Sequence, residues 1–181
     1  LSAGGAEVVF TFLNGKEEAE EIVSDIQASG AKIESLFLDI TENLLINLPK
    51  VNLLVYMPTP FIFDAVKSKF SPLLFKKFLD YYIFGLHKII ENLDLSDPLV
   101  VFNPSSVAID DLPLNMGEYS SAKAASEIMS NFLEKANKNL KFHCPRLSRL
   151  NTDQTNSIRP TKNENPIPVI FNELNIIREL Y

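Results

Sequence analysis

Three residues in the second half of the chain have side chains that could deliver a proton together: Ser106, Tyr119 and Lys123. Tyr119 and Lys123 are four positions apart in a predicted helix, so they share one face of it. Ser106 ends an apolar run, and a loop that folds back over this run would bring its hydroxyl to the same place. The phenol would give the proton, the ammonium would lower the pKa of the phenol, and the serine hydroxyl would hold the oxygen that receives the proton. The alternative is a helix N-terminus that merely exposes a tyrosine and a lysine.

Predicted strands and helices alternate along the chain and would have to position these residues. β-Branched and apolar runs predict strands over 7–13, 32–39, 51–57, 98–102 and 140–145. Apolar residues at helical spacing predict helices over 16–29, 71–93, 117–137 and 169–180. Polar residues and prolines predict a loop over 148–168. This order predicts an α/β fold with a doubly wound parallel sheet, in which ligands bind beyond the carboxyl ends of the strands.

Composition excludes several classes of function. The 181 residues suit a single domain, 1–181, and a net charge of −6 argues against a nucleic-acid surface. The single cysteine, Cys144, excludes an internal disulfide and suits a reducing cytoplasm, and no apolar run is long enough to predict a membrane span. His143 and Cys144 are neighbours on a predicted strand and point to opposite faces, and no other spacing suits a metal site, so no metal is expected.

The step of 13 residues from Ser106 to Tyr119, followed by Lys123 and an Ala-Ala-Ser run, resembles the Ser, Tyr-x-x-x-Lys active site of the short-chain dehydrogenase/reductase family. The resemblance implies a Rossmann-like fold and catalytic roles for these three residues. It also implies a cofactor site. The segment Leu38-Asp39-Ile40-Thr41 resembles the family motif that touches the adenine ring, with turn formation as the alternative role of Asp39. Further cofactor contacts are implied for three residues: Tyr56 in the nicotinamide region, Lys123 on the ribose and Thr152 on the nicotinamide amide.

The sequence also departs from the family pattern, mainly where the family cradles its cofactor. The first strand and the Gly-rich turn are absent, so the domain is expected to be N-terminally incomplete and part of something longer. Tyr56-Met57-Pro58-Thr59 replaces an Asn-Asn-Ala-Gly turn, and Tyr82 replaces the helix asparagine of the active site. Because the missing strand is central in the family, we expect an upstream segment or a partner to supply it before the chain folds as a complete enzyme.

Two functions from different classes remain open. The first is an NADP-dependent carbonyl reductase, resembling the ketoreductase-type domains of fatty-acid and polyketide assembly lines. Its substrate would be a small-molecule or carrier-bound carbonyl compound. No acidic residue ends the first predicted strand and Lys16 follows it, which favours NADP, with NAD as the alternative. The second is a reductase-like scaffold that has lost cofactor binding. The wide apolar arc of helix 71–93 favours a homo-oligomer or a larger chain in either case.

Overall fold

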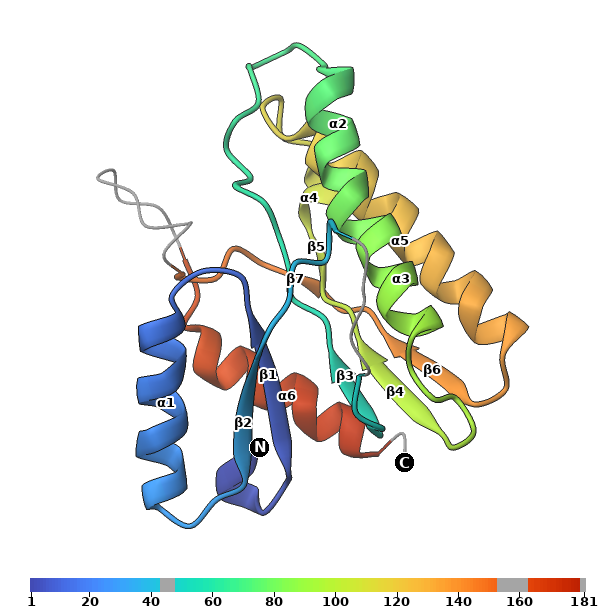
Figure 1. Ribbon diagram of the computed structural model, residues 1–181. Coiled ribbons are helices and arrows are strands. Elements are labelled where there is room, and N and C mark those ends of the chain that lie inside the picture. The colour runs from blue at the N-terminus through green and yellow to red at the C-terminus, as the bar shows by residue number, and fades with distance from the viewer. Residues whose placement is uncertain (43–47, 153–162, 180–181) are drawn as a thin grey trace. The chain divides into compact units, whose positions relative to one another are not determined.

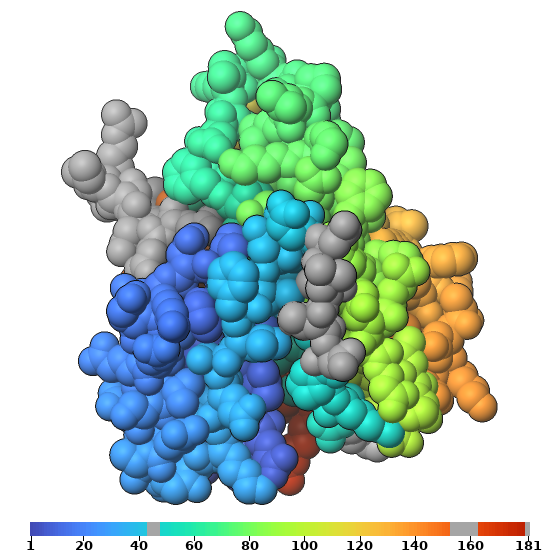
Figure 2. Space-filling model, in the orientation of Figure 1, coloured from blue at the N-terminus to red at the C-terminus, as the bar shows by residue number. Residues whose placement is uncertain are grey.

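A computed structural model describes residues 1–42, 48–152 and 163–179 of the chain (Figure 1). The chain forms two compact units, Leu1–Ile46 and Asn47–Tyr181. In the space-filling view the first unit has the blue shades and the second the remaining colours (Figure 2). Each unit is built on parallel strands, as the sequence predicts.

The first unit is a strand–helix–strand motif. Strand β1 (Val8–Phe12) pairs in parallel with β2 (Ile33–Phe37), with Val8 opposite Ile33. Helix α1 (Lys16–Ala28) joins them and follows a short 3₁₀ turn, η1 (Ser2–Gly4), and β1. Gly15 turns the chain from β1 into α1 with φ of 72°, a left-handed conformation that favours glycine. These elements confirm the predicted ones, with each strand shorter at its ends.

The second unit contains a three-stranded parallel sheet in the order β3 (Leu53–Val55), β4 (Leu99–Phe102), β6 (Leu140–His143). All four residues of β4 are buried, which explains why its sequence is apolar without alternation. Beyond β4, the two-residue strand β5 (Ser105–Ser106) pairs in parallel with β7 (Arg146–Leu147). These two short strands were not predicted, because two residues give no periodicity. Among the described residues, β1 pairs only with β2 and β3 pairs on one side with β4, so a further supplied strand stays a prediction.

Helices of the second unit surround its sheet. The predicted helix 71–93 is present but is divided into α2 (Pro72–Leu79), a π-helical segment η2 (Asp80–Gly85) and α3 (Leu86–Glu91). Ser71 caps it, accepting a hydrogen bond from the backbone N–H of Leu74. Helix α4 (Ala108–Asp111) is a single turn before α5 (Gly117–Ala136), and α6 (Pro166–Arg178) ends the described chain. Helix α6 begins three residues earlier than predicted because Asn165 caps it and Pro166 suits its first turn.

The two faces of β4 are covered by different helices. Val100 and Phe102 pack against Ile177 of α6. Asn103 projects to the opposite face, where its side-chain amide donates hydrogen bonds to Ser126 Oγ (3.0 Å) and Ser130 Oγ (3.1 Å) of α5. The helices on both faces confirm the doubly wound arrangement. No helix in the described part of the chain has the length and apolarity needed to cross a membrane. The predicted loop 148–168 lies partly outside the described residues.

Candidate functional site

The structure brings Ser106 and Tyr119 together. Ser106 ends β5, where pairing with Leu147 of β7 fixes its register. Tyr119 lies in the first turn of α5, and Ser120 beside it donates a hydrogen bond to the carbonyl oxygen of Ala108 at 2.7 Å, which ties α5 to α4. The hydroxyl of Ser106 lies near enough to the Tyr119 phenol to lower the pKa of that phenol. The predicted convergence of serine and tyrosine is therefore present.

Lys123 follows one turn later on α5 and reaches into the same region. Its Nζ donates a hydrogen bond to the carbonyl oxygen of Pro104 at 2.8 Å and lies 4.1 Å from the centroid of the Tyr82 ring. Burial lowers the pKa of Lys123 from 10.5 to about 8, while the charges of Cys144 and Glu127 act in the opposite direction. The amine can therefore change its charge near neutral pH.

The pKa of the Tyr119 phenol is shifted in the opposite direction from the one that the sequence suggested. Burial raises the pKa of Tyr119, and the hydrogen bond with Ser106 lowers it by a smaller amount. The sequence predicted that Lys123 would lower this pKa, but Lys123 is not among the causes of the shift, and its ammonium contacts the carbonyl oxygen of Pro104 and the Tyr82 ring. Tyr119 consequently remains protonated at neutral pH, as a proton donor must be.

A charged network fixes β5, β7 and α5 relative to one another. The Glu127 carboxylate accepts hydrogen bonds from Arg146 Nε (2.9 Å) and Nη2 (2.7 Å) and from Ser105 Oγ (2.5 Å). Arg146 also pairs with Asp110. Hydrogen bonding to Arg146 is the largest cause that holds the pKa of Glu127 below its usual range. The network anchors the strand that presents Ser106. Sequence reasoning missed Glu127, although its place four residues after Lys123 on one helix face was a usable signal.

Tyr56 and the residues after it are engaged in packing. Tyr56 is buried, and its hydroxyl donates to the carbonyl oxygen of Tyr81 at 2.6 Å. The Thr59 hydroxyl lies 2.5 Å from the hydroxyl of Tyr82. The segment that departs from the family turn is therefore joined to the π-helical segment by two tyrosine hydroxyls. A packing role for Tyr56 agrees with these contacts, and its cofactor role stays a prediction.

The remaining cofactor candidates lie in both units. Asp39 Oδ1 accepts hydrogen bonds from the Thr41 backbone N–H (2.8 Å) and hydroxyl (2.6 Å), so Asp39 forms a turn after β2 in the first unit. Ile40 is buried beside it. Thr152 is exposed in the second unit, at the end of a described segment. The cofactor contacts of Asp39, Ile40 and Thr152 therefore stay predictions. The described ranges contain no group of three or more His, Cys, Asp or Glu side chains that could hold a metal ion.

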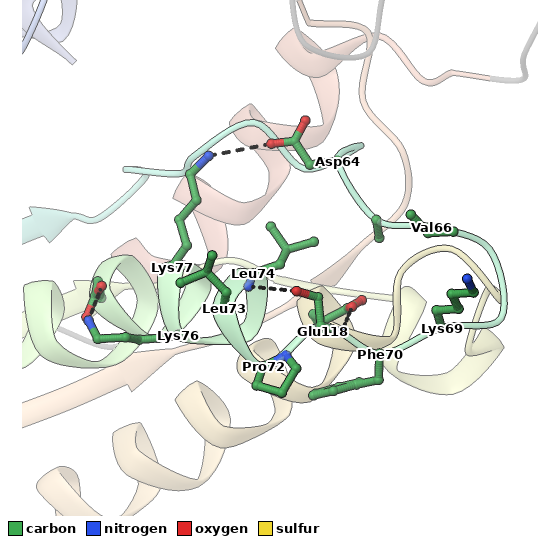
Figure 3. Close-up of a pocket in the computed structure, with 13 residues that line it drawn as sticks. Asp64, Val66, Lys69, Phe70, Pro72, Leu73, Leu74, Lys76, Lys77 and Glu118 are labelled. Atoms are coloured by element: carbon green, nitrogen blue, oxygen red, sulfur yellow. Dashed lines mark hydrogen bonds and ion pairs between the residues drawn. The ribbon is translucent and has the colours of Figure 1, made fainter.

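An open groove of about 850 Å³ lies next to the site, at the start of α2 (Figure 3). Its lining includes Phe70, Leu73, Leu74 and Glu118, and it does not include Ser106, Tyr119 or Lys123. Glu118 is 1% exposed, and its Oε1 accepts a hydrogen bond from the backbone N–H of Ser71 at 2.5 Å. This bond joins the start of α5 to the start of α2.

Comparison with solved structures identifies the fold. An alcohol dehydrogenase from the archaeon Thermococcus sibiricus, complexed with 5-hydroxy-NADP, superposes with a TM-score of 0.79 at 14% identity, covering 98% of this chain and 82% of that one. A 3-oxoacyl (acyl-carrier-protein) reductase from Agrobacterium tumefaciens with NADP bound gives 0.72 at 16% identity, covering 84% and 64%. A short-chain dehydrogenase/reductase from Serratia marcescens gives 0.69 at 13% identity, covering 84% and 67%.

The chain therefore has the Rossmann-like fold of the short-chain dehydrogenases/reductases, as its motifs suggested. It spans about two thirds of the length of two of these proteins, 64% and 67%. No protein-family model and no curated protein matches the sequence.

Proposed function

We propose that this protein is an NADP-dependent carbonyl reductase in which Tyr119 is the proton donor. The observation that supports the proposal is the approach of the Ser106 hydroxyl to the Tyr119 phenol, whose pKa it lowers, with Lys123 one turn further along α5. The alternative reading of a surface tyrosine and lysine does not explain why the phenol meets a serine hydroxyl from another element.

In the proposed reaction, each residue acts on the carbonyl oxygen of the substrate. Ser106 holds this oxygen by hydrogen bonding, and Tyr119 transfers its phenolic proton to the oxygen as negative charge develops there. Burial keeps the proton on Tyr119 until it is needed, and the bond with Ser106 stabilises the tyrosinate that remains. Lys123 would hold the ribose of the cofactor from the same helix face. NADPH supplies the hydride to the carbonyl carbon when it is bound.

The first unit has a feature that suits the phosphate of NADP. The turn from β1 into α1 ends at Gly15, and Lys16 is the first residue of the helix. Helix N-termini favour anions, and the exposed ammonium of Lys16 adds a positive charge there, 3.6 Å from Glu20. Glu17 and Glu18 in the same turn oppose an anion, so the preference for NADP depends on Lys16. Replacing Lys16 with alanine should weaken NADPH binding and leave NADH binding nearly unchanged.

For the substrate we propose a β-ketoacyl compound, free or bound to a carrier. The likeness to a 3-oxoacyl (acyl-carrier-protein) reductase supports this choice. The test is to titrate the full-length protein with NADPH, following nicotinamide fluorescence, and then to measure oxidation of NADPH with a β-ketoacyl ester. Tyr119→Phe should abolish turnover and leave NADPH affinity intact. Absence of NADPH binding at millimolar concentration would refute the reductase function.

A second candidate is a scaffold without cofactor binding. The observation that favours it is the packing of Tyr56, Thr59 and Tyr82 where the family pattern has a glycine-containing turn and an asparagine. The same titration separates the two functions, because a scaffold shows neither a change in fluorescence nor turnover. Under the scaffold function, Tyr119→Phe would alter stability alone.

A further inference from the structure

Tyr82 contacts both Tyr119 and Lys123, although the sequence marked it only as a departure from a pattern. It lies in the π-helical segment η2, is 2% exposed, and forms a core cluster with Phe78 and Ala122. A π-helical turn inserts one residue into the helical repeat and re-aims the side chains near it, and such turns are frequent at functional sites. The orientation of Tyr82 is therefore the first point to explain.

The Tyr82 ring is held in one orientation by contacts on several sides. Its hydroxyl lies 2.5 Å from the hydroxyl of Thr59. The Phe78 ring stacks on it, with centroids 5.9 Å apart and planes 4° apart. Its backbone carbonyl accepts a hydrogen bond from Ser126 Oγ at 3.1 Å. A ring fixed in this way can hold other groups in place.

Two of the proposed catalytic residues contact this ring. Lys123 Nζ lies over its face at 4.1 Å from the centroid. The Tyr119 ring meets it edge to face, with centroids 5.9 Å apart and an angle of 80°. The electron-rich face of an aromatic ring attracts a cation, most strongly where water is excluded. Besides the ring, the ammonium has one hydrogen-bond acceptor among the described residues, the carbonyl oxygen of Pro104, although it carries three donors.

We propose that Tyr82 is a positioning residue. Its ring holds the Lys123 ammonium by a cation–π interaction and so keeps it in place beside Tyr119. The claim that this positioning serves catalysis rests on the proposed function. The contact between Tyr82 and Lys123 itself does not depend on activity. A purely structural role for Tyr82 would require only its volume in the core, whereas this role requires the electron density of its ring.

Replacing the ring with analogues of similar size but different electron density separates these roles. Tyr82→Phe keeps the ring face, and incorporation of 3,4,5-trifluorophenylalanine at position 82 withdraws electron density from it. The pKa of Lys123 is measured in the full-length protein by titrating the ¹³Cε resonance of labelled lysine, assigned with Lys123→Met. The other charged groups that act on Lys123, Glu127 and Cys144, are the same in both variants.

Attraction to the ring favours the charged amine, so loss of electron density should lower the Lys123 pKa further. We expect a fall of about one unit between the phenylalanine and trifluorophenylalanine proteins, a tenfold change in the ratio of amine to ammonium. The same analogue at Phe78, which stacks on Tyr82, is the matched control and should leave Lys123 unchanged. Equal Lys123 titrations in the two position-82 variants would overturn the proposal.

Failure of this proposal can be distinguished from failure of the proposed function. A Lys123 shift in a protein that binds no NADPH would support the positioning role and refute the reductase. If the protein is a reductase, the pH profile of kcat should move with the Lys123 titration in the position-82 variants. If the reductase is active and the pH profile of its kcat is the same with and without the analogue at position 82, Tyr82 has no role in catalysis.

Discussion

Burial of Lys123 makes a quantitative prediction about stability. In the folded protein the pKa of Lys123 is about 8, against an ordinary value of 10.5. Below pH 8 the amine is charged in both the folded and the unfolded chain, and folding bears the full penalty of burying that charge. Between pH 8 and 10.5 the unfolded chain binds more protons than the folded one, so the free energy of unfolding rises with pH.

From pH 7 to pH 9 the free energy of unfolding should rise by about 1.3 kcal/mol because of Lys123 alone. This range includes one pH unit above the folded pKa, and one unit corresponds to about 1.4 kcal/mol. Lys123 keeps partial contact with solvent, which screens some of the penalty, so this figure is an upper value. Lys123→Met removes the titrating group. The difference in unfolding free energy between wild type and this variant should therefore move by about 1.3 kcal/mol in favour of wild type over this range.

The assay is urea unfolding of the full-length protein, followed by far-UV circular dichroism at pH 7, 8 and 9. The range ends at pH 9 because the pKa of Cys144 is raised from 9.0 by burial, and its titration would oppose that of Lys123. Lys135→Met, at an exposed position in the last turn of α5, controls for the loss of a positive charge. Parallel pH profiles for wild type and Lys123→Met would show that the ammonium is not desolvated, and the reasoning would be wrong.

Three further predictions concern neighbouring parts of the second unit. Ser106→Ala removes the hydrogen bond that lowers the pKa of Tyr119, so Tyr119 should titrate at higher pH, as measured from the ¹³Cζ resonance of labelled tyrosine. Glu127→Gln should lose about 1 kcal/mol of stability at pH 7 in urea unfolding. Because the pKa of Glu127 is lowered in the fold, this difference should shrink as the pH falls below the unfolded value of about 4.3. Ile177→Ala should cost about 2–5 kcal/mol, since this side chain is 1% exposed against β4, whereas Ile167→Ala at a 76% exposed position of the same helix should be nearly neutral.

Regular elements were predictable because local patterns encode them, and the serine–tyrosine pair was predicted from its resemblance to a family motif. Helical spacing places Tyr119 and Lys123 on one face of α5, and the apolar run of β4 predicts a buried parallel strand. The cap Ser71 fixes the start of its helix through its nearest neighbours in sequence, and Asn165 does the same for α6, although the prediction placed that start three residues too late.

Contacts between elements were not predictable in the same way. Nothing local indicates that Glu127 meets Arg146, or that Glu118 caps the helix after Ser71, because these pairs are joined only when β5, β7, α2 and α5 assemble. The π-helical segment around Tyr82 was also missed, since its residues follow ordinary helical spacing in the sequence. Long-range pairing thus decided the surroundings of the site.

The sequence by itself determined that this chain alternates strands and helices and presents a serine, a tyrosine and a lysine at the carboxyl end of a buried strand. Spacing suffices for the shared face of Tyr119 and Lys123, since backbone geometry converts it directly into faces, and the resemblance to a family motif added Ser106. Only the tertiary structure decided how these residues are charged. Burial keeps the proton on Tyr119, and the Tyr82 ring rather than the phenol of Tyr119 receives the Lys123 ammonium, because the pKa of each group depends on what surrounds it in three dimensions.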